Sequence, residues 1–361
     1  MDTIEFEREQ FEEHVWREVI GALEVASIYL GDRLGLYRAL EDGSPVTAEG
    51  LAVRTGVHQR YAREWLEQQA VAGILEVEDP GAEPEARRFR LPAAHAAVLA
   101  DPDSLFYSAP LSRLVRGVME ALPQVVRAYR TGGGVEWSAY GADTREGQAA
   151  SNRPAFLGLL GRQWLPGIAD VHARLQGEPP ARVADIGCGE GWSSIGIALA
   201  YPKAEVHGFD LDSESIEAAR RHAEEEGLDG RVRFEARDAG DPELAGRYDL
   251  VTAFECIHDM ADPVGALRAM RRMAGGGGTV LVADEPVPDR FTAPGEDVER
   301  YHYGWSVTCC LPAGMSEQPS AMTGTVMRTD TMATYAEEAG FARFEVLPIE
   351  EDWFRFYRLT P

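Results

Sequence analysis

A glycine-rich segment carries the clearest chemical signal of the chain. Gly187-Cys-Gly-Glu-Gly191 lies between a short apolar stretch, Arg182–Ile186, and a helical pattern that begins at Trp192. Glycines in such a turn let the backbone approach a ligand closely, and the start of the following helix offers unpaired N–H groups. Because several kinds of nucleotide enzyme carry a G-x-G-x-G segment, this loop by itself predicts only a nucleotide-like ligand.

Two carboxylates follow the next two apolar stretches and could complete such a site. Asp210 comes directly after Glu205–Phe209, and Asp238 follows Val232–Ala236. An acid at the end of the second strand can accept both hydroxyls of a ribose, and the next acid can meet an adenine amine. An Asp at a strand end is often only a turn former. Their occurrence after successive strands favours the binding role.

A histidine beyond the fourth apolar stretch is the best candidate for moving a proton. His258 lies in Cys256-Ile-His-Asp-Met260, directly after residues 248–253. An imidazole titrates near neutrality and can act as a general base toward a hydroxyl group, with Asp259 beside it as a second catalytic candidate. A single histidine is otherwise usually a structural residue, so the catalytic role depends on its position at the strand ends.

His258, Asp259 and His302 form a second constellation. Two imidazoles and one carboxylate are a ligand set suited to Fe(II) or Zn. His302 belongs to Arg300-Tyr-His-Tyr-Gly-Trp305, whose aromatic side chains could stack on a planar acceptor, although aromatic core packing is more frequent. The sequence leaves the distance between His258 and His302 open, so the metal site and the metal-free site remain alternatives.

The elements that must position these residues alternate from residue 181 onward. Short apolar stretches and helical segments follow one another, which is typical of a doubly wound parallel sheet. The predicted strands are residues 182–186, 205–209, 232–236, 248–253, 279–283, 341–347 and 352–359, and the predicted helices are 192–200, 213–226, 263–273 and 331–339. We therefore expect a Rossmann-like α/β domain of seven strands over residues 181–361, with an insertion at 285–322 that covers the substrate.

The first part of the chain has a different pattern. Apolar residues at helical spacing, two short helices and two short strands predict a mostly helical winged-helix domain over residues 1–110. Its predicted elements are a helical stretch at 6–40 with a break at Gly31-Asp32, a helix at 47–56 opened by Thr47 and closed by Gly56, a helix at 57–71, and strands at 73–77 and 88–91. Residues 111–180 indicate a helical linker, interrupted at 132–134, that contributes to the substrate pocket.

The charge of the chain bears on its partners. The formal net charge is −25, and residues 1–110 hold ten basic and twenty-one acidic residues, a net charge of −11. A helix that reads DNA normally has a basic footprint around it, whereas the helix at 57–71 carries Glu64 and Glu67 beside Arg60 and Arg63. We therefore expect no nucleic-acid partner.

Composition also limits the location of the protein. No apolar run approaches the ~18 residues of a membrane span, and the acidic start of the chain is unlike a signal peptide. We expect a cytoplasmic protein that does not associate with membranes. Four cysteines lack the spacing of a zinc or disulfide framework and are expected to be free, buried thiols: Cys188, Cys256, Cys309 and Cys310.

Several of these segments together resemble the successive motifs of class I S-adenosylmethionine-dependent methyltransferases. They are Val183–Gly191, Phe209-Asp210, Arg237-Asp238 and Asp249-Leu250-Val251, with weaker similarity at 324–328, 338–341 and 354–358. The resemblance implies S-adenosylmethionine as the cofactor, bound by Asp185, Gly187, Gly189, Asp210, Leu211, Asp238, Ala239 and Phe254. A nicotinamide cofactor fits less well, because the loop lacks the spacing of G-x-G-x-x-G.

With the winged helix in front, the whole chain resembles bacterial small-molecule methyltransferases related to O-methyltransferases. That resemblance implies a homodimer formed by the N-terminal domain and a small-molecule acceptor, with O-methylation of a secondary metabolite as the expected reaction. Segment 256–260 is similar to the Leu-His-Asp-Trp motif of O-methyltransferases, with Met260 in place of the aromatic residue. His302, Trp305 and Glu285 are the expected substrate-binding residues.

Two other functions stay open at this point. Some related C-methyltransferases of 2-oxo acids use a metal to enolise the substrate, and the resemblance implies that His258, Asp259 and His302 would be its ligands. A ligand-sensing regulator could instead keep the methyltransferase fold and bind DNA through the winged helix. The negative charge of the N-terminal domain counts against this last alternative.

Overall fold

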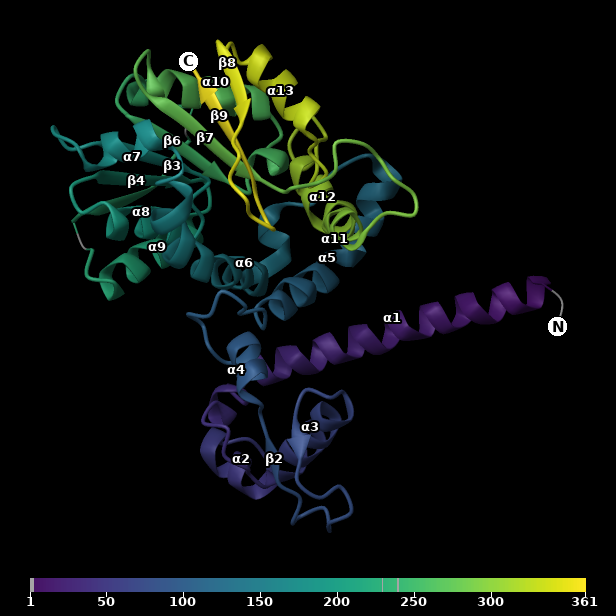
Figure 1. Ribbon diagram of the computed structural model, residues 1–361. Coiled ribbons are helices and arrows are strands. Elements are labelled where there is room, and N and C mark those ends of the chain that lie inside the picture. Colours follow the sequence, from purple (N-terminus) through teal and green to yellow (C-terminus); the bar gives the residue numbers. More distant parts are fainter. Residues whose placement is uncertain (1–2, 229, 239) are drawn as a thin grey trace. The chain divides into compact units, whose positions relative to one another are not determined.

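The chain forms two compact units. The computed structural model describes residues 3–228, 230–238 and 240–361. The first unit comprises residues 1–116 and 146–154, and the second comprises 117–145 and 155–361 (Figure 1). The chain therefore passes from one unit to the other within α5 (Leu111–Thr131) and within α6 (Gly141–Ala155). In the part of the chain described, no helix is both long and apolar enough to cross a membrane.

The first unit begins with a long helix and continues as the predicted winged helix. Helix α1 spans Thr3–Arg33 and ends close to the predicted break. Its last turn contains Gly31. A glycine is needed at this position because a Cβ atom would collide with the rings of Tyr37 and Trp65. These two rings fill the space beside the glycine and anchor the end of α1 to the winged helix.

The winged helix follows from local capping and a short hairpin. Helix α2 (Ala48–Thr55) begins where the Thr47 side chain accepts a hydrogen bond from Gly50 N, and it ends at Gly56, whose φ is 75°. Helix α3 (Gln59–Val71) follows, and β1 (Glu76–Val77) pairs antiparallel with β2 (Phe89–Arg90) before α4 (Ala93–Leu99). The prediction of a winged helix is confirmed, although both strands of the wing are shorter than expected.

The second unit is built around a seven-stranded sheet. Its strands are β3 (Arg182–Ile186), β4 (Glu205–Asp210), β5 (Val232–Ala236), β6 (Leu250–Phe254), β7 (Thr279–Asp284), β8 (Arg343–Val346) and β9 (Arg355–Thr360). The order is β5-β4-β3-β6-β7-β9-β8, with β3 to β7 parallel and β9 antiparallel to both β7 and β8. The predicted Rossmann-like fold of seven strands is confirmed.

Strand β6 starts later than the sequence pattern predicts, at Leu250 instead of residue 248. Backbone N–H of Tyr248 donates to Met273 O, and Asp249 N donates to Arg182 O. These bonds join residues 248–249 to the end of a helix and the start of β3, so the regular ladder begins only at Leu250.

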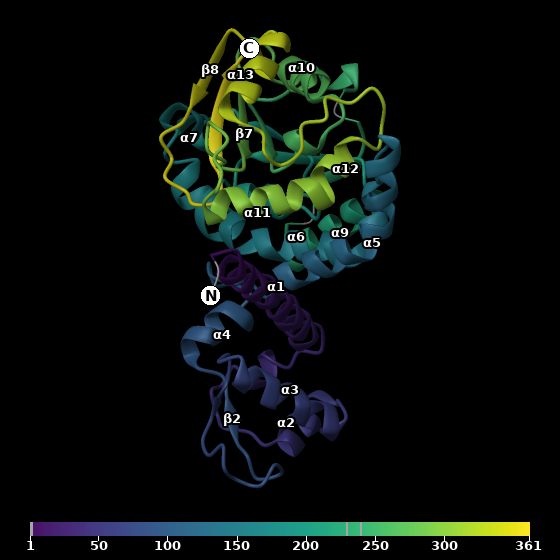
Figure 2. The same ribbon diagram turned by 90° about the vertical axis from the view of Figure 1, so that its right-hand side faces the viewer.

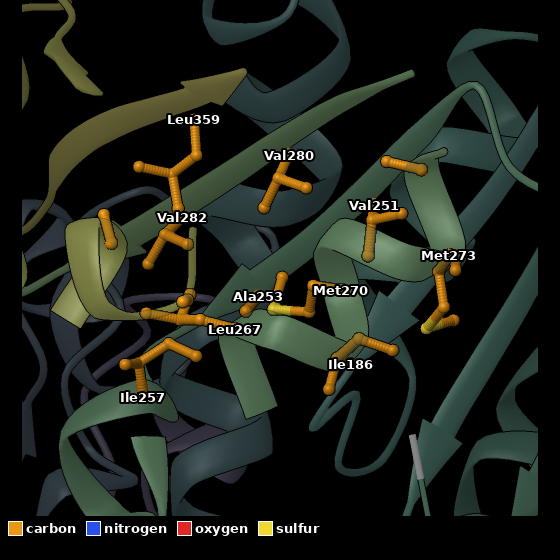
Figure 3. Close-up of a cluster of buried hydrophobic side chains, with 14 of the residues drawn as sticks. Ile186, Val251, Ala253, Ile257, Leu267, Met270, Met273, Val280, Val282 and Leu359 are labelled. Carbon is orange, nitrogen blue, oxygen red and sulfur yellow. The ribbon is translucent and has the colours of Figure 1, made fainter. Parts of the chain in front are cut away.

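Alternation along the strands separates the two faces of the sheet. Figure 1 shows α8 (Trp192–Ala200) and α9 (Ser213–Glu225) on one side, and α10 (Pro263–Ala274) and α13 (Thr329–Glu338) on the other. Ile186, Ala253 and Val282 belong to the core beneath α10, where Leu267 and Met270 meet them (Figure 3). The intervening residues Asp185 and Thr252 point to the opposite face, because successive strand side chains alternate.

The predicted insertion after β7 is mostly helical. It contains α11 (Asp297–Trp305), a π-helical turn at Ser306–Cys310 and α12 (Leu311–Gly314). Val135 N donates to Pro312 O, and in Figure 2 α12 lies next to the end of α5. Gly134 allows this contact, since a Cβ there would stand 2.1 Å from Ser316 N.

Helical segments also precede the sheet. A 3₁₀ turn at Trp137–Tyr140 follows α5, and a π-helical segment at Phe156–Trp164 leads from α6 to α7 (Ala169–Gln176). The Tyr140 hydroxyl donates to the carbonyls of Thr308 and Cys309 at 3.2 Å each, which ties the 3₁₀ turn to the insertion.

Candidate active site

The glycine loop leaves open space on one side. Gly187, Gly189 and Gly191 have φ values of 65°, 51° and 88°, in the left-handed region that favours glycine. A Cβ at Gly191 would stand 2.7 Å from the Phe234 ring, so this glycine is also needed for packing. At Gly189, by contrast, no described atom lies within 4 Å of the Cβ position. The loop therefore offers exposed backbone at Gly189, as a ligand cradle requires.

Asp210 connects the glycine loop to the next helix. Its Oδ2 accepts a hydrogen bond from Gly189 N at 2.8 Å, and its Oδ1 accepts one from Asp212 N at 2.9 Å. Burial raises the pKa of this carboxyl group. Asp210 thus stands at the carboxyl end of β4, directly beside the open glycine.

Asp185 has a different environment from the one expected of a ligand-binding acid. Its carboxylate is 1% exposed and accepts hydrogen bonds from three hydroxyl groups: Ser193 at 2.6 Å, Ser194 at 2.7 Å and Thr252 at 2.7 Å. These bonds hold the first turn of α8 against β3 and β6. These three hydroxyl partners were not predicted from the sequence, although two of them, Ser193 and Ser194, lie in the helical turn that follows the glycine loop.

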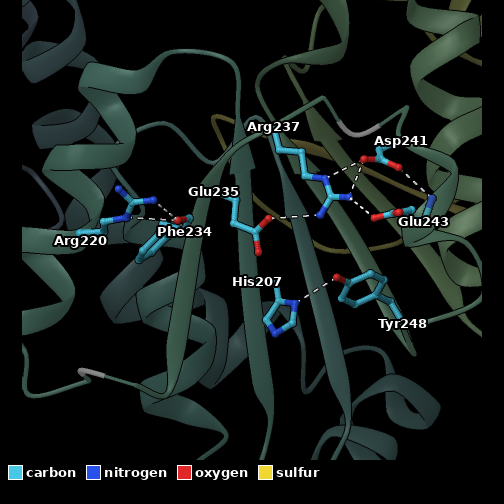
Figure 4. A network of polar contacts seen from close by, with 8 residues as sticks. All are labelled: His207, Arg220, Phe234, Glu235, Arg237, Asp241, Glu243 and Tyr248. Atoms are coloured by element: carbon cyan, nitrogen blue, oxygen red, sulfur yellow. Dashed lines mark hydrogen bonds and ion pairs between the residues drawn. The ribbon is translucent and has the colours of Figure 1, made fainter.

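The end of β5 carries Asp238 on an exposed turn. Asp238 Oδ1 accepts a hydrogen bond from Gly240 N at 2.7 Å. Arg237 beside it reaches Asp241 at 2.9 Å, Glu243 at 3.1 Å and Glu235 at 3.3 Å, and this network braces the turn (Figure 4). Ala239, the other predicted residue here, lies outside the described residues.

Two predicted apolar cofactor residues differ in exposure. Leu211, directly after Asp210, is 74% exposed, which is unusual for a leucine next to buried elements. Phe254 is buried at the end of β6, and its ring centroid lies 5.3 Å from that of Phe156. Glu255 follows with a φ of 50°, a left-handed conformation that non-glycine residues seldom adopt and that often marks functional turns.

His258 lies in a buried cluster of carboxylates. Its Nδ1 is 2.8 Å from Asp284 Oδ1 and 3.1 Å from Glu285 Oε2, and its Nε2 is 3.2 Å from Asp259 Oδ1. Burial acts to lower the pKa of this imidazole, but the charges of the three carboxylates outweigh it and raise the pKa well above its usual value. The ring therefore holds a proton more strongly than an isolated histidine.

The pKa values of the two acids next to His258, Asp284 and Glu285, are shifted in opposite directions. Burial acts to raise the pKa of Asp284, yet the charge of His258 outweighs it and leaves that pKa below its usual value. Burial raises the pKa of Glu285 well above its usual value. Asp284 was not predicted from the sequence, although it ends β7 in the same way that Asp210 ends β4.

His302 lies near this cluster without joining it. The side chain is 3% exposed, and neither ring nitrogen has a hydrogen-bond partner within the described part of the protein. Burial, followed by the charge of His258, lowers its pKa to about 4. Trp305 is partly exposed on the same helix, with its ring centroid 5.8 Å from that of Tyr301.

Two groups of side chains in the described structure have the spacing of metal ligands, and both contain His258. One adds Asp259 and Cys310, and the other adds Asp284 and Glu285, with the donor atoms of each group within 4.8 Å of one another. His302 belongs to neither group. The structure thus brings His258, Asp259 and Glu285 together as the sequence predicts, and it adds Asp284 and Cys310.

The glycine loop and the His258 turn are direct neighbours. A Cβ at Gly187 would stand 2.8 Å from Cys256 Sγ, and Cys256 precedes the turn at Ile257–Asp259. Both segments follow adjacent parallel strands, β3 and β6. A ligand held at the loop would therefore lie at the same edge of the sheet as the imidazole, which is where open α/β sheets bind ligands.

Comparison with known proteins follows the same division of the chain. A methyltransferase domain family matches residues 178–334, and an Rv2258c-like winged HTH domain family matches residues 12–101. The ubiquinone biosynthesis O-methyltransferase of Bordetella pertussis is 30% identical over 177 residues, which cover 47% of this chain and 68% of that protein. For other proteins of this name that it matches at 35% identity, the chain spans about half of their length, 46%.

Solved structures match the whole chain in fold. The mitomycin 7-O-methyltransferase MmcR is 22% identical with a TM-score of 0.70, and 98% of each chain is covered. Human N-acetylserotonin methyltransferase, solved in complex with SAM, is 16% identical with a TM-score of 0.71, and 97% of each chain is covered. The chain belongs to the S-adenosylmethionine-dependent methyltransferases and carries a winged-helix domain at its N-terminus.

Proposed function

We propose that this protein transfers the methyl group of S-adenosylmethionine to an oxygen atom of a small-molecule acceptor, with His258 receiving the acceptor's proton. The observation that carries the proposal is the contact between the glycine loop and the His258 turn, through Gly187 and Cys256. It supports the proposal because the glycine loop and a buried imidazole lie at one edge of the sheet. The mitomycin and ubiquinone enzymes named above, both O-methyltransferases, support transfer to oxygen.

The proposed cofactor site includes the glycine loop and residues at the ends of the neighbouring strands. We propose that the loop at Gly187 and Gly189, with its open space beside Gly189, holds the methionine part, that Asp210 accepts the ribose hydroxyls, and that Asp238 meets the adenine amine. Asp185 would act through the hydroxyls that it binds rather than by direct contact. Leu211, with its large exposed apolar surface, would cover one face of the adenine, and the remaining contacts would come from Ala239 and Phe254.

The residues around His258 would divide the work of the reaction. When bound, S-adenosylmethionine supplies a methyl group on a positively charged sulfur. Asp284, 2.8 Å from Nδ1, orients the ring so that Nε2 can accept the acceptor's hydroxyl proton. The acceptor oxygen, freed of its proton, would then bond to the methyl carbon, and the electron pair of the S–C bond would stay on sulfur. Because reaction requires in-line approach, His302, Trp305 and Glu285 would bind and position the acceptor.

Calorimetry with S-adenosylmethionine tests the cofactor site. We expect Asp210→Ala to weaken binding at least ~10-fold, since it loses both the ribose contacts and the hydrogen bond to Gly189 N. Asp330→Ala, at an exposed site in the first turn of α13, serves as the matched control and should bind like wild type. Equal binding by wild type and Asp210→Ala would show the cofactor assignment to be wrong.

Isotope-labelled cofactor and mass spectrometry test the methyl transfer. The full-length protein should transfer the label to oxygen of a phenol or hydroxyl acceptor from a panel that includes secondary metabolites. His258→Gln should lower kcat ~10²–10⁴-fold, the usual contribution of a general base, while S-adenosylmethionine still binds. Label found on carbon would contradict transfer to oxygen.

A second candidate function is metal-assisted C-methylation of a 2-oxo acid. It is favoured by His302, whose buried ring nitrogens both lack a hydrogen-bond partner among the described residues. His258, Asp259 and His302 are chemically suited to Fe or Zn, and they would hold an ion that stabilises an enolate. Metal analysis of protein handled without oxygen, beside His302→Ala, tests this function, which predicts stoichiometric metal that the variant loses.

We also propose a homodimer formed through α1. Within this helix only Gly31 is buried, while large apolar side chains are exposed along its length: Ile4, Phe6, Phe11, Val15, Trp16, Val19, Ile20, Leu23 and Leu30. Apolar patches of this extent normally mark an interaction surface. A second copy of the chain is the partner that the family resemblance predicts. No nucleic-acid partner is proposed, and a gel shift with steep salt dependence would revive the regulator alternative.

A further inference from the structure

We propose that His258, Asp259 and Cys310 form a binding site for a thiophilic divalent cation, with zinc as the best fit. The inference rests on the proposed function, because it concerns the residues assigned there to proton transfer. It differs from the second candidate function in its ligands, since a thiolate takes the place of His302. Donor atoms of these three residues lie within 4.8 Å of one another.

The distances suit a common ion between the donors. A tetrahedral zinc ion keeps its nitrogen, oxygen and sulfur ligands roughly 3.3–3.8 Å apart, as its bond lengths of about 2.0–2.3 Å require. His258 Nε2 and Asp259 Oδ1 are 3.2 Å apart. Asp259 Oδ1 is nevertheless buried without a hydrogen-bond partner in the described structure. The two atoms form an ion pair only when Nε2 carries a proton, and with a neutral ring both are available to one shared cation.

The far side of the imidazole has the support that metal-binding histidines usually have. Asp284 Oδ1 lies 2.8 Å from Nδ1, so an N–H at that nitrogen would donate to a carboxylate. This partner fixes the tautomer in which Nε2 carries the free lone pair, and it makes the ring a stronger ligand. Asp284 is 1% exposed and is therefore held in place by its surroundings.

The local charge balance calls for a cation. Three carboxylates, those of Asp259, Asp284 and Glu285, stand within 3.2 Å of one imidazole. Asp284 Oδ2 and Glu285 Oε2 are also buried without hydrogen-bond partners in the described residues. Buried carboxylates normally pair with a cation or coordinate a metal, because an unpaired charge is costly away from water. Even with Glu285 protonated, two carboxylates face one imidazole.

The fold brings Cys310 to this position from a distant part of the chain. Cys310 ends the π-helical turn at Ser306–Cys310, and α12 continues from it. A Cβ at Gly314 would stand 3.1 Å from the backbone oxygen of Asp259, so α12 packs closely against the His258 turn. The neighbouring Cys309 is buried in an apolar cluster with Val118 and Val125, against which Cys310 also packs. Of the two adjacent thiols, Cys310 is the one whose sulfur lies within ligand spacing of His258 and Asp259.

The three donor types favour zinc, and they leave one coordination position open to the acceptor. Thiolate, imidazole and carboxylate together suit zinc better than magnesium or calcium, which prefer oxygen ligands alone. Three protein ligands leave the fourth position of a tetrahedral ion open, as in catalytic zinc sites. Asp259 and Cys310 are partly exposed, so the acceptor's oxygen can reach that position. In the metal-bound protein the ion would lower the pKa of the acceptor hydroxyl, and the proton would pass to water, because the ion occupies the Nε2 position that accepts it in the metal-free protein.

Titration of the metal-free, full-length protein with Co²⁺ and Zn²⁺ tests the site. We expect one ion per chain, and the Co²⁺ form should show the near-ultraviolet charge-transfer band of a cobalt–thiolate bond. Cys310→Ser should lose this band and bind Zn²⁺ at least ~10-fold more weakly in competition with a chromophoric chelator. Asp284→Asn should keep the band and lose ~10–100-fold in affinity, as supporting partners of a metal-bound histidine do.

Two control variants separate this site from its alternatives. Cys309→Ser should keep the band, because its sulfur is not among the grouped donor atoms, and His302→Ala should keep both the band and the affinity. Loss of metal in His302→Ala, or a band that survives in Cys310→Ser, would overturn the proposed ligand set. So would a wild-type protein that binds S-adenosylmethionine but neither ion. Calorimetry with S-adenosylmethionine is independent of metal, so a failure of the proposed function would be seen separately.

Discussion

At the scale of single residues, the environment of His258 decides what its imidazole can do. Nδ1 lies 2.8 Å from Asp284 and 3.1 Å from Glu285, while Nε2 lies 3.2 Å from Asp259. Nδ1 is thus occupied by the two acids at the end of β7, and Nε2, which faces Asp259, is the nitrogen available to an acceptor's proton or to a metal ion. The same carboxylates raise the pKa of the ring, so they set the pH at which it can work.

This environment predicts the pH dependence of methyl transfer. A general base must be neutral, and the raised pKa of His258 keeps its ring protonated above the usual value of 6.5. The ascending limb of kcat/KM should therefore lie above pH 6.5. In Asp284→Asn one raising charge is gone, so the limb should shift to lower pH while kcat falls. An unchanged limb in that variant would show that the titrating group is not His258.

Asp185 leads to a prediction about stability. Its removal in Asp185→Ala would leave the buried hydroxyls of Ser193, Ser194 and Thr252 without their shared acceptor. With about 1–3 kcal/mol for each unsatisfied buried group, reduced by partial relaxation, we expect the free energy of unfolding to fall by at least about 3 kcal/mol. Urea unfolding of the variant measures this, with Asp330→Ala as a surface control. A loss below about 1 kcal/mol would contradict the structural role.

At the scale of elements, the insertion between β7 and α13 completes the candidate site. It brings His302 and Cys310 toward the His258 turn, while Trp305 packs against the apolar cluster that includes Val118, and it is held there by close backbone contacts. One contact joins α12 to the His258 turn at Gly314, and another joins the segment after α12 to Gly134. Small residues at these two points let the insertion approach the sheet.

Two adjacent glycines allow a matched test of this arrangement. In Gly134→Ala the new Cβ would stand 2.1 Å from Ser316 N and push the backbone after α12 away. In Gly133→Ala the nearest atom, Thr131 Oγ1, is 3.4 Å away, which is an ordinary contact. We expect Gly134→Ala to lower kcat/KM for the acceptor ~10²-fold, because a displacement of about 1 Å can cost that much.

The binding of S-adenosylmethionine should distinguish this displacement from unfolding. Both glycine variants should bind the cofactor within ~2-fold of wild type, because the glycine loop and Asp210 lie on other elements. Equal turnover by Gly133→Ala and Gly134→Ala would mean that the insertion does not position the acceptor.

At the scale of the whole molecule, the surface of the first unit indicates which partners the protein can bind. In the first unit, the arginines of α3 are already paired, since Arg60 contacts Glu64 and Arg63 contacts Glu85 at 2.8 Å. These pairs and the net negative charge of residues 1–110 leave little basic surface for phosphate groups. The exposed apolar side chains of α1 make this helix the stronger candidate for an interface.

The proposed dimer predicts a mass that depends on α1. Light scattering after size-exclusion chromatography should give twice the mass of the 39.6 kDa chain. Trp16→Glu combined with Leu23→Glu should shift the protein toward monomer, because charges would replace two side chains that are 63% and 65% exposed. The pair Arg17→Glu and Glu13→Arg, which only exchanges partners of an exposed ion pair, is the control. A monomeric wild-type protein would contradict the proposal.

The sequence by itself determined the fold class and the family, because their signals are local. Alternating apolar stretches and helical segments predict a doubly wound sheet, and glycines in left-handed turns predict the loop after β3. Asp210 and Asp238 followed from their places at strand ends. The winged helix followed from a capping threonine, a terminating glycine and a short hairpin.

Only the tertiary structure decided the contacts around His258. Asp284 lies 26 residues away along the chain, and Cys310 and His302 belong to an insertion whose path no local pattern specifies. The three hydroxyl groups on Asp185 and the missing partners of His302 likewise depend on side chains from separate elements. Periodicity predicts which face of an element is buried, but it does not predict which side chains from separate elements come into contact there. The chemistry of this site depends on those contacts.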